Sequence, residues 1–428
     1  MATLLPPEQM QPTPGPEDEQ GMMFDLDDPM AEVEEQEDGS AIVRMDEFKG
    51  PTENEDFYSN LAERQILGID LDNLALRYIK LLKNDKEARE ERDKKYEEGL
   101  RRTGMGNDAP GGANFNGASK VVHPVLAEAC IDFESRAIKE LFPPDGPVRT
   151  HIVGEVDAED TERAERKRDF MNWQLTEQIE EFRDEQEQML TQLPLGGSQF
   201  MKMWYDEKKR RPCAEFVAID NILLPFSAVN FYTAQRVTEV QDITQETFED
   251  RVDSGLYRDI DIIKASMEPE MSNSEKANDK IEGRQFQEND DGIRTVYHIY
   301  TMLELEDDKE SGGELAPYIL MIDDLSTEVV GLYRNWEEGD ESMKKLDWLI
   351  EFKFIPWRGA YAIGLPHLIG GLAAAITGAL RALLDTAHIN NAATMIKLKG
   401  AKMSGQSQQV DVTQVTEIEA GPRIDDIR

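Results

Sequence analysis

The chain has 428 residues, of which 47 are lysine or arginine and 87 are aspartate or glutamate, so its formal net charge is -40. This length exceeds one ordinary hydrophobic core, and we expect roughly two to four structural units. So negative a chain repels nucleic acid, which argues against non-specific DNA binding but leaves open a protein that handles DNA without adhering to it. Its two cysteines suit a reducing compartment and argue against a disulfide-built secreted protein.

The first 56 residues are rich in proline, glutamate, aspartate and methionine, with "DLDDPMAEVEEQEDGS" as the most acidic part. A segment of this composition buries too little apolar surface to offset the entropy lost on ordering. The sequence therefore predicts a disordered acidic tail over residues 1–56.

Helical periodicity begins at Leu61 and continues to Arg102 as a helix with a highly charged surface. After a loop rich in glycine and asparagine, a second helix is expected to begin near Pro124 and to end before Pro143. Its expected buried stripe consists of Val125, Ala129, Phe133 and Ala137.

The clearest helical periodicity in the chain follows. It runs from Asp160 to the pair Gly196-Gly197, which is expected to end the helix. Apolar residues recur at helical spacing throughout it. They are Trp173, Ile179, Phe182, Met189 and Leu190. The sequence predicts one continuous helix here, and residues 57–195 as a whole are expected to be helical.

The period changes to two at residue 196. "SQFMKMWYDEKKRRPCAEFVAID" predicts a hairpin with a charged tip, and a short helix closed by Gly255 follows. Four further strand patterns end at "WLIEFKFIPW", whereas residues 259–291 are acidic and predict an exposed insertion. Residues 196–362 are therefore expected to be mainly antiparallel β, and the fold class is α+β.

The sequence offers no arrangement typical of catalysis. Gly112 and Gly117 have the spacing of a phosphate-binding loop, but Lys120 does not directly follow the second glycine. The five histidines lack a zinc-protease pattern, and the two cysteines lack zinc-ligand spacing, so structural or surface roles are expected for them. We expect no enzyme activity, no cofactor and no metal site.

The stretch "GLPHLIGGLAAAITGALRALLDTAHINNA", which begins at Gly364, is almost free of charge. About 13 residues between His367 and Arg381 are uncharged, whereas a membrane span needs roughly 20. Asp385 then follows on the same helix. We therefore expect a helix over residues 363–395 without stable membrane insertion.

Two ridges of side chains at a spacing of four residues run along this helix. One consists of the small residues Gly370, Ala374, Gly378 and Ala382, and the other of Leu368, Leu372, Ile376, Leu380 and Leu384. Small residues allow another backbone to approach closely, which would compensate for the cost of about 1 kcal/mol per helical glycine. Two interpretations remain: a helix buried in a globular core, or a helix wedged between identical neighbours in a ring.

The order of these features resembles the portal proteins of tailed bacteriophages, the head-to-tail connectors. A strand ending "IEFKFIPW" leads into the long helix with "LRALLDTAHINNA", and a lysine-bearing β segment follows. Upstream, the hairpin, the corner from Asp220 to Pro225 and Arg236 on a strand are similar to the portal wing. "HPVLAEACIDFESRAIKELFP" looks like the early wing helix of portals from short-tailed phages. The resemblance covers the chain from about Leu61 to its end.

The resemblance implies a ring, usually of twelve subunits, at one vertex of the capsid, through which double-stranded DNA is packaged and ejected. It assigns residues 57–362 to the wing, 363–395 to the first stem helix and 396–428 to part of the clip. The ring would contact terminase, tail or adaptor proteins, and the major capsid and scaffold proteins. Its location would be the virion, after assembly in the host cytoplasm.

Two further expectations come with the resemblance. Gly370, Ala374, Gly378 and Ala382 would pack against the neighbouring subunit, and Arg381, Lys397, Lys399 and Lys402 would meet DNA phosphate or acidic partners, unless they are ordinary solvated cations. Because portals continue beyond the clip with a second stem helix, more wing and a crown, the chain is expected to be an N-terminal portion of a portal. The alternative is another virion structural or scaffold protein that assembles without contacting DNA.

Overall fold

The computed structural model describes the backbone and side chains of most of the chain. The described ranges are 57–63, 70–106, 118–154, 156–206, 208–260, 271–284, 292–305, 308 and 310–390, with the backbone alone at 31–35, 41–45, 391, 397–398 and 417–418. The chain divides after Phe57 into two units, and each is described by itself.

The first unit contains a two-stranded antiparallel hairpin, β1 (Ala31–Glu35) and β2 (Ala41–Met45). The prediction of a tail without structure over residues 1–56 is therefore wrong for these two segments. Both strand sequences place β-branched residues beside polar ones, and an Asp-Gly pair between them is typical of hairpin turns. The acidic composition of the whole segment masked this local signal.

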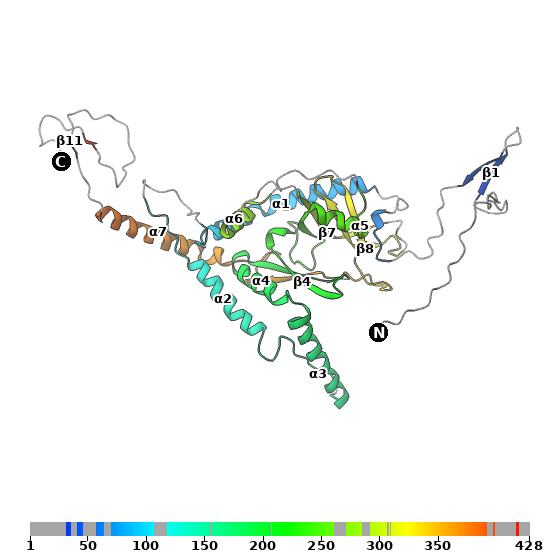
Figure 1. Cartoon of the computed structure of the whole chain (residues 1–428), viewed down its shortest axis with the longest axis horizontal. Helices are drawn as coiled ribbons and strands as arrows, with labels where there is room; N and C mark the ends of the chain where they lie inside the picture. The colour runs from blue at the N-terminus through cyan, green and yellow to red at the C-terminus, as the bar shows by residue number, and fades with distance from the viewer. Residues whose placement is uncertain are drawn as a thin grey trace, which may run out of the picture. The chain divides into compact units, whose positions relative to one another are not determined.

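The second unit contains the remaining elements (Figure 1). The helices are η1 (Leu61–Glu63), α1 (Leu71–Arg101), α2 (Val125–Leu141), α3 (Ala158–Trp173), the π-helical turn η3 (Gln174–Gln178), α4 (Phe182–Gly196), η4 (Ile219–Asn221), α5 (Gln245–Asp253), α6 (Asn273–Glu282) and α7 (Leu365–Asn391). The strands are β3 (Ser198–Asp206), β4 (Arg211–Val217), β5 (Ile222–Leu223), β6 (Arg236–Thr244), β7 (Ile293–Glu304), β8 (Leu315–Asp323), β9 (Val329–Arg334), β10 (Leu349–Lys353), β11 (Lys397–Leu398) and β12 (Glu417–Ile418). This confirms the predicted α+β class.

Two antiparallel sheets organise the second unit. One has the order β5-β6-β7-β8-β9, and the other has the order β10-β3-β4 and includes the predicted hairpin. A core cluster joins the two sheets to α1: it contains Phe200 of β3, whose ring centre lies 5.0 Å from that of Phe231 at an interplanar angle of 44°, and Leu100 of α1. Tyr78 of α1 also shares a hydrogen bond of 2.9 Å with Thr301 of β7. Helix α1 is thereby fixed to the sheets.

The turn between α4 and β3 determines where α7 leaves these sheets. Gly197 has a φ angle of +81°, and its amide donates to Leu193 O at 2.8 Å, so the predicted helix stop is confirmed. A Cβ at this position would lie 2.6 Å from Ala362 O and 2.8 Å from Gly364 N. Only glycine allows the segment that enters α7 to cross here.

The predicted continuous helix from Asp160 is wrong. Helix α3 ends at Trp173, a π-helical turn follows, and α4 begins at Phe182. Helix α3 buries none of its own residues, whereas Met189 of α4 is fully buried against β3 and β4. The interruption lets Ile179, which is 2% exposed, enter the α4 cluster while α3 stays in solvent.

The predicted buried stripe of α2 is displaced by one residue. Leu126, Cys130 and Ile138 are buried, whereas the predicted positions Val125, Ala129, Phe133 and Ala137 are half-buried. Helix α2 packs against both α4 and α7, so it buries a wider face than a single stripe.

The predicted exposed insertion over residues 259–291 contains a packed helix. Helix α6 begins with a capping box in which Ser272 and Glu275 bond each other's backbone amides. Ser274 donates to Asp220 Oδ1 at 2.6 Å, and Ala277 is buried beside α1. The capping-box spacing was visible in the sequence and was outweighed by the acidic composition.

Candidate functional site

Helix α7 carries most of the residues that the sequence singled out, and its start is attached to the end of α1. The ring of Pro366 packs where Gly99 has no side chain, since a Cβ there would lie 2.9 Å from Pro366 Cβ. One turn later, Arg102 Nη1 donates to Gly370 O at 2.6 Å. These contacts set the direction of the helix.

The segment before α2 runs along the same face of α7. The amide of His123 donates to Thr377 Oγ1 at 3.2 Å, and Arg381 Nε donates to Val121 O at 2.8 Å. The amide of Ser119 donates to Asp385 Oδ1 at 2.6 Å. One face of α7 is therefore held by its own chain over about four helical turns.

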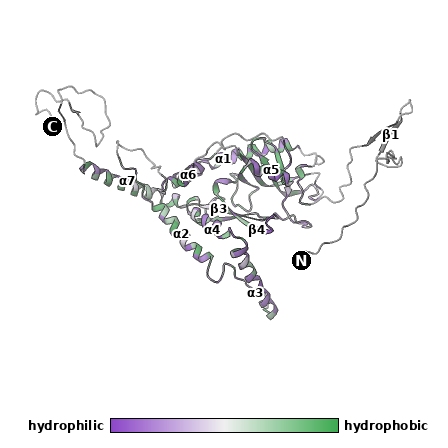
Figure 2. Ribbon diagram, in the orientation of Figure 1, coloured by the Kyte–Doolittle hydropathy of each residue, from purple (hydrophilic) through white to green (hydrophobic). Residues whose placement is uncertain are grey.

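Apolar residues recur along α7 (Figure 2), and those on its opposite face are exposed. Leu368 is 57% exposed, Leu372 is 61% exposed and Leu383 is 70% exposed. A helix of a globular core buries such side chains against its own chain. The core-helix interpretation is therefore wrong, because the described chain covers only one side of α7.

The predicted row of small residues is divided between the two faces. Gly370 is buried beneath Arg102, whereas Ala374, Gly378 and Ala382 are exposed. A row at a spacing of four residues drifts by about 40° per step, so it starts on the covered face and ends on the open one. The open face instead carries a different small set, Gly371, Ala375, Gly378 and Ala382, which we call the outer face.

Among the described residues, α7 is the one helix that is long and apolar enough to cross a membrane. Within residues 365–390, a window of 18 residues has a mean hydropathy of 1.5, and 17% of that window is buried. The two charged residues that argued against a span, Arg381 and Asp385, are both bonded to the segment before α2. Length and composition alone thus allow a span, and a helix covered by other proteins has the same properties.

The predicted DNA-contacting cations have separate positions. Arg381 bonds Val121 O and lies on α7, where it holds the segment before α2. Lys397 belongs to β11, which pairs in parallel with β12. Lys399 and Lys402 lie outside the described residues.

A groove of about 480 Å³ lies beside β3, β4 and β6. Its central ion pair joins Lys202 Nζ to Glu239 Oε1 at 2.8 Å, and Tyr300 donates to the same carboxylate at 3.0 Å. Both partners are largely buried, and the pair ties one sheet to the other. This arrangement stabilises the contact between the sheets, since each charged group already has a partner.

His298 lies under this groove and has a structural role. It is 6% exposed, and its Nε2 shares a hydrogen bond of 3.1 Å with the hydroxyl of Tyr257. Burial, together with the nearby Lys202 ammonium, lowers the pKa of His298 to about 3. The imidazole is therefore neutral at pH 7, and the expectation of a structural histidine is confirmed here.

His298 makes the folded chain sensitive to acid. An unfolded histidine has a pKa of about 6.5, so the unfolded state binds the extra proton between about pH 6.5 and pH 3, and stability falls as the pH falls through that window. Between pH 7 and pH 5, this group should lower the free energy of unfolding by roughly 2 kcal/mol.

Urea unfolding of wild type and His298→Gln at both pH values measures this pH-dependent loss. Burial raises the pKa of Asp220 to about 6, so this carboxyl stabilises the fold as the pH falls. Its contribution is the same in both proteins and cancels when they are compared. Equal pH dependence in the two proteins would contradict the prediction.

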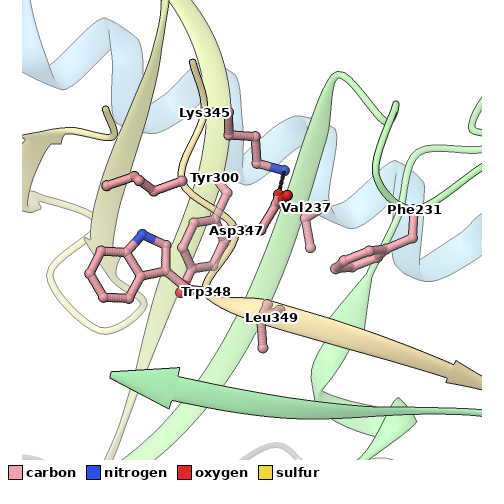
Figure 3. Close-up of a pocket in the computed structure, with 8 residues that line it drawn as sticks. Phe231, Val237, Tyr300, Lys345, Asp347, Trp348 and Leu349 are labelled. Carbon is pink, nitrogen blue, oxygen red and sulfur yellow. Dashed lines mark ion pairs between the residues drawn. The ribbon is translucent and has the colours of Figure 1, made fainter. Parts of the chain in front are cut away.

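A small pocket at the junction of the sheets is shown in Figure 3. It lies among Tyr300, Trp348 and Leu349, beside the ion pair of Lys345 with Asp347 at 3.5 Å. Its volume of about 10 Å³ admits at most one water molecule. It is a packing defect of the core and too small for a ligand.

Within the described ranges, no group of three or more histidine, cysteine, aspartate or glutamate residues is arranged to hold a metal ion. No protein-family model matches the chain, and no curated protein matches it significantly. A functional proposal therefore depends on α7, on the face that is bonded to the segment before α2 and on the face that is exposed.

Proposed function

We propose that the chain is a portal subunit of a tailed bacteriophage, which forms a ring at one capsid vertex and provides a conduit for double-stranded DNA. The observation that supports this most is the open apolar face of α7, where Leu372 and Leu383 lie more than half exposed. The order of helices, hairpin, strands and long helix agrees with the sequence resemblance.

A ring explains why one side of α7 is left uncovered. Exposed leucines next to small residues favour association, because leucines fill grooves and small residues let two backbones approach. In a closed ring, a head-to-tail contact repeats until every such face is covered. The face bonded to the segment before α2 would then orient α7 relative to the wing of its own subunit.

The charge of the chain fits a conduit. A net charge of -40 repels phosphate, so DNA would slide through the ring without being held. The candidates for contact with DNA or acidic partners are Lys397, Lys399 and Lys402. Arg381 is a poorer candidate than the sequence indicated, because its guanidinium bonds the backbone of its own chain. Terminase and tail or adaptor proteins remain the proposed partners.

Electron microscopy of the purified chain tests this proposal. Rings with a central hole are the expected result. Chains that stay monomeric at all concentrations, or that float with lipid vesicles through α7, would contradict it. Rings that fail to co-purify with terminase would favour the alternative, a virion structural or scaffold protein that assembles without contacting DNA.

A further inference from the structure

A pocket of about 200 Å³ lies beside the middle of α1. Its walls include Arg89 and Arg92 of α1, the loop residues Pro225 and Phe226, and Tyr361. Phe226 is 89% exposed, so the described chain leaves this phenyl ring almost uncovered at the pocket.

The charged side chains around this pocket differ in how many hydrogen-bond and ion-pair partners they have. Arg89 donates to Asp93 Oδ2 at 2.9 Å and to three backbone carbonyls, so its donors are used. Asp85, the carboxylate that lines the pocket, is already held by two nitrogens of Arg236 at 2.7 and 2.9 Å. The nearby carboxylates of Asp93 and Asp220 favour the charged form of Arg92 and compensate part of its charge.

The guanidinium of Arg92 has an unused hydrogen-bond donor. Its guanidinium lies 4.8 Å from the ring centre of Tyr361, and its Nη2 donates to Gly196 O. Its Nη1 is buried and has no hydrogen-bond partner among the described residues. Burial and the like charge of Arg89 lower the pKa of Arg92, so a negative group near it would be stabilising. A buried charged donor without an acceptor is destabilising, and a ligand acceptor would remove that cost.

We infer that this pocket binds a peptide segment of a partner protein that presents a carboxylate next to an aromatic or aliphatic side chain. A carboxylate matches the planar fork of Arg92, and the apolar side chain would pack against Pro225 and Phe226. The volume accommodates one side-chain-sized group. Inorganic phosphate lacks the apolar part, so it would leave the Phe226 wall uncovered.

Ligand-observed NMR with phenylacetate, phenylacetamide and inorganic phosphate tests the inference on the full chain. Phenylacetate is expected to bind about tenfold more tightly than its uncharged amide, and more tightly than phosphate. Arg92→Met should abolish the preference for the acid. Phe226→Ala should weaken phenylacetate roughly threefold, and its exposed position makes folding insensitive to the change.

Arg77→Met is the matched control, because Arg77 is an exposed arginine of the same helix that does not line the pocket. It should bind phenylacetate like wild type. Equal affinity for acid and amide, no weakening in Phe226→Ala, or tighter binding of phosphate would each overturn the inference. The Phe226→Ala result decides the matter even if Arg92→Met fails to fold.

Discussion

Replacing Gly378 by leucine is expected to prevent assembly while leaving each chain folded. Gly378 is exposed, and apart from its chain neighbours and the adjacent backbone of its own helix, no described atom lies within 4 Å of the position that its Cβ would take. Within one chain the substitution only removes a helical glycine, which should stabilise the helix by about 0.5–1 kcal/mol. Against a neighbouring chain, the added side chain would hold two closely packed backbones apart. Analytical ultracentrifugation gives the assembly state, and thermal unfolding gives the stability.

The matched control for this substitution is Ala387→Leu. Ala387 is exposed on the same helix and lies half a turn around from Gly378. It gains a comparable side chain on the opposite side, and assembly should proceed as in wild type. Normal assembly of Gly378→Leu, or equal loss in both variants, would show that the outer face is not a specific contact.

The largest loss of stability is expected from Asp323→Asn. Asp323 and Arg294 are both 0% exposed, and they are joined by two hydrogen bonds of 2.6 and 2.8 Å. The guanidinium also lies 4.2 Å from the ring centre of Phe248, so it cannot reach water without disrupting the core. Removing the partner charge leaves a buried cation uncompensated, which costs roughly 3–5 kcal/mol. Urea unfolding monitored by circular dichroism measures this loss.

An exposed ion pair provides the comparison. Glu187 and Arg183 of α4 lie 3.1 Å apart, with side chains 41% and 65% exposed. Glu187→Gln should change the free energy of unfolding by less than about 0.5 kcal/mol, because water screens such pairs. If Asp323→Asn were equally mild, the buried pair would have no special importance for the sheet.

Much of the fold was predictable from local pattern. The change of hydrophobic period at residue 196 separated the helical part from the sheets, and β3 and β4 pair as the hairpin pattern predicted. Gly197 and Gly255 both have positive φ and follow helices, as their positions predicted. These signals depend on neighbouring residues only, and for that reason they could be read from the sequence.

Features that depend on distant contacts were missed. The interruption before α4 follows from burial of Ile179 in a cluster with residues distant in the sequence, including Ala214 of β4, which lies 35 residues further on. The covered face of α7 is set by a hydrogen bond between residues 254 positions apart, His123 and Thr377. A spacing of four residues cannot reveal which side of a helix its own chain will cover.

The role of Arg381 shows the same limit at the candidate site. From the sequence it resembled a free cation near the end of an apolar helix. In the structure its acceptor is the carbonyl of Val121, and backbone acceptors leave no trace in a sequence. The outer face also needed the structure, because Gly371 and Ala375 became candidates only once the covered side of α7 was known.

The most direct test of the proposed ring is the accessibility of the outer face in the intact chain. Ala375→Cys places a thiol on that face, and Ala387→Cys places one on another side of the same helix, while the native Cys130 and Cys213 are buried. If copies of the chain cover the outer face, maleimide should label residue 375 much more slowly than residue 387 in assembled particles, and equally fast in dissociated chains. Equal labelling rates at both positions in every state would contradict the account.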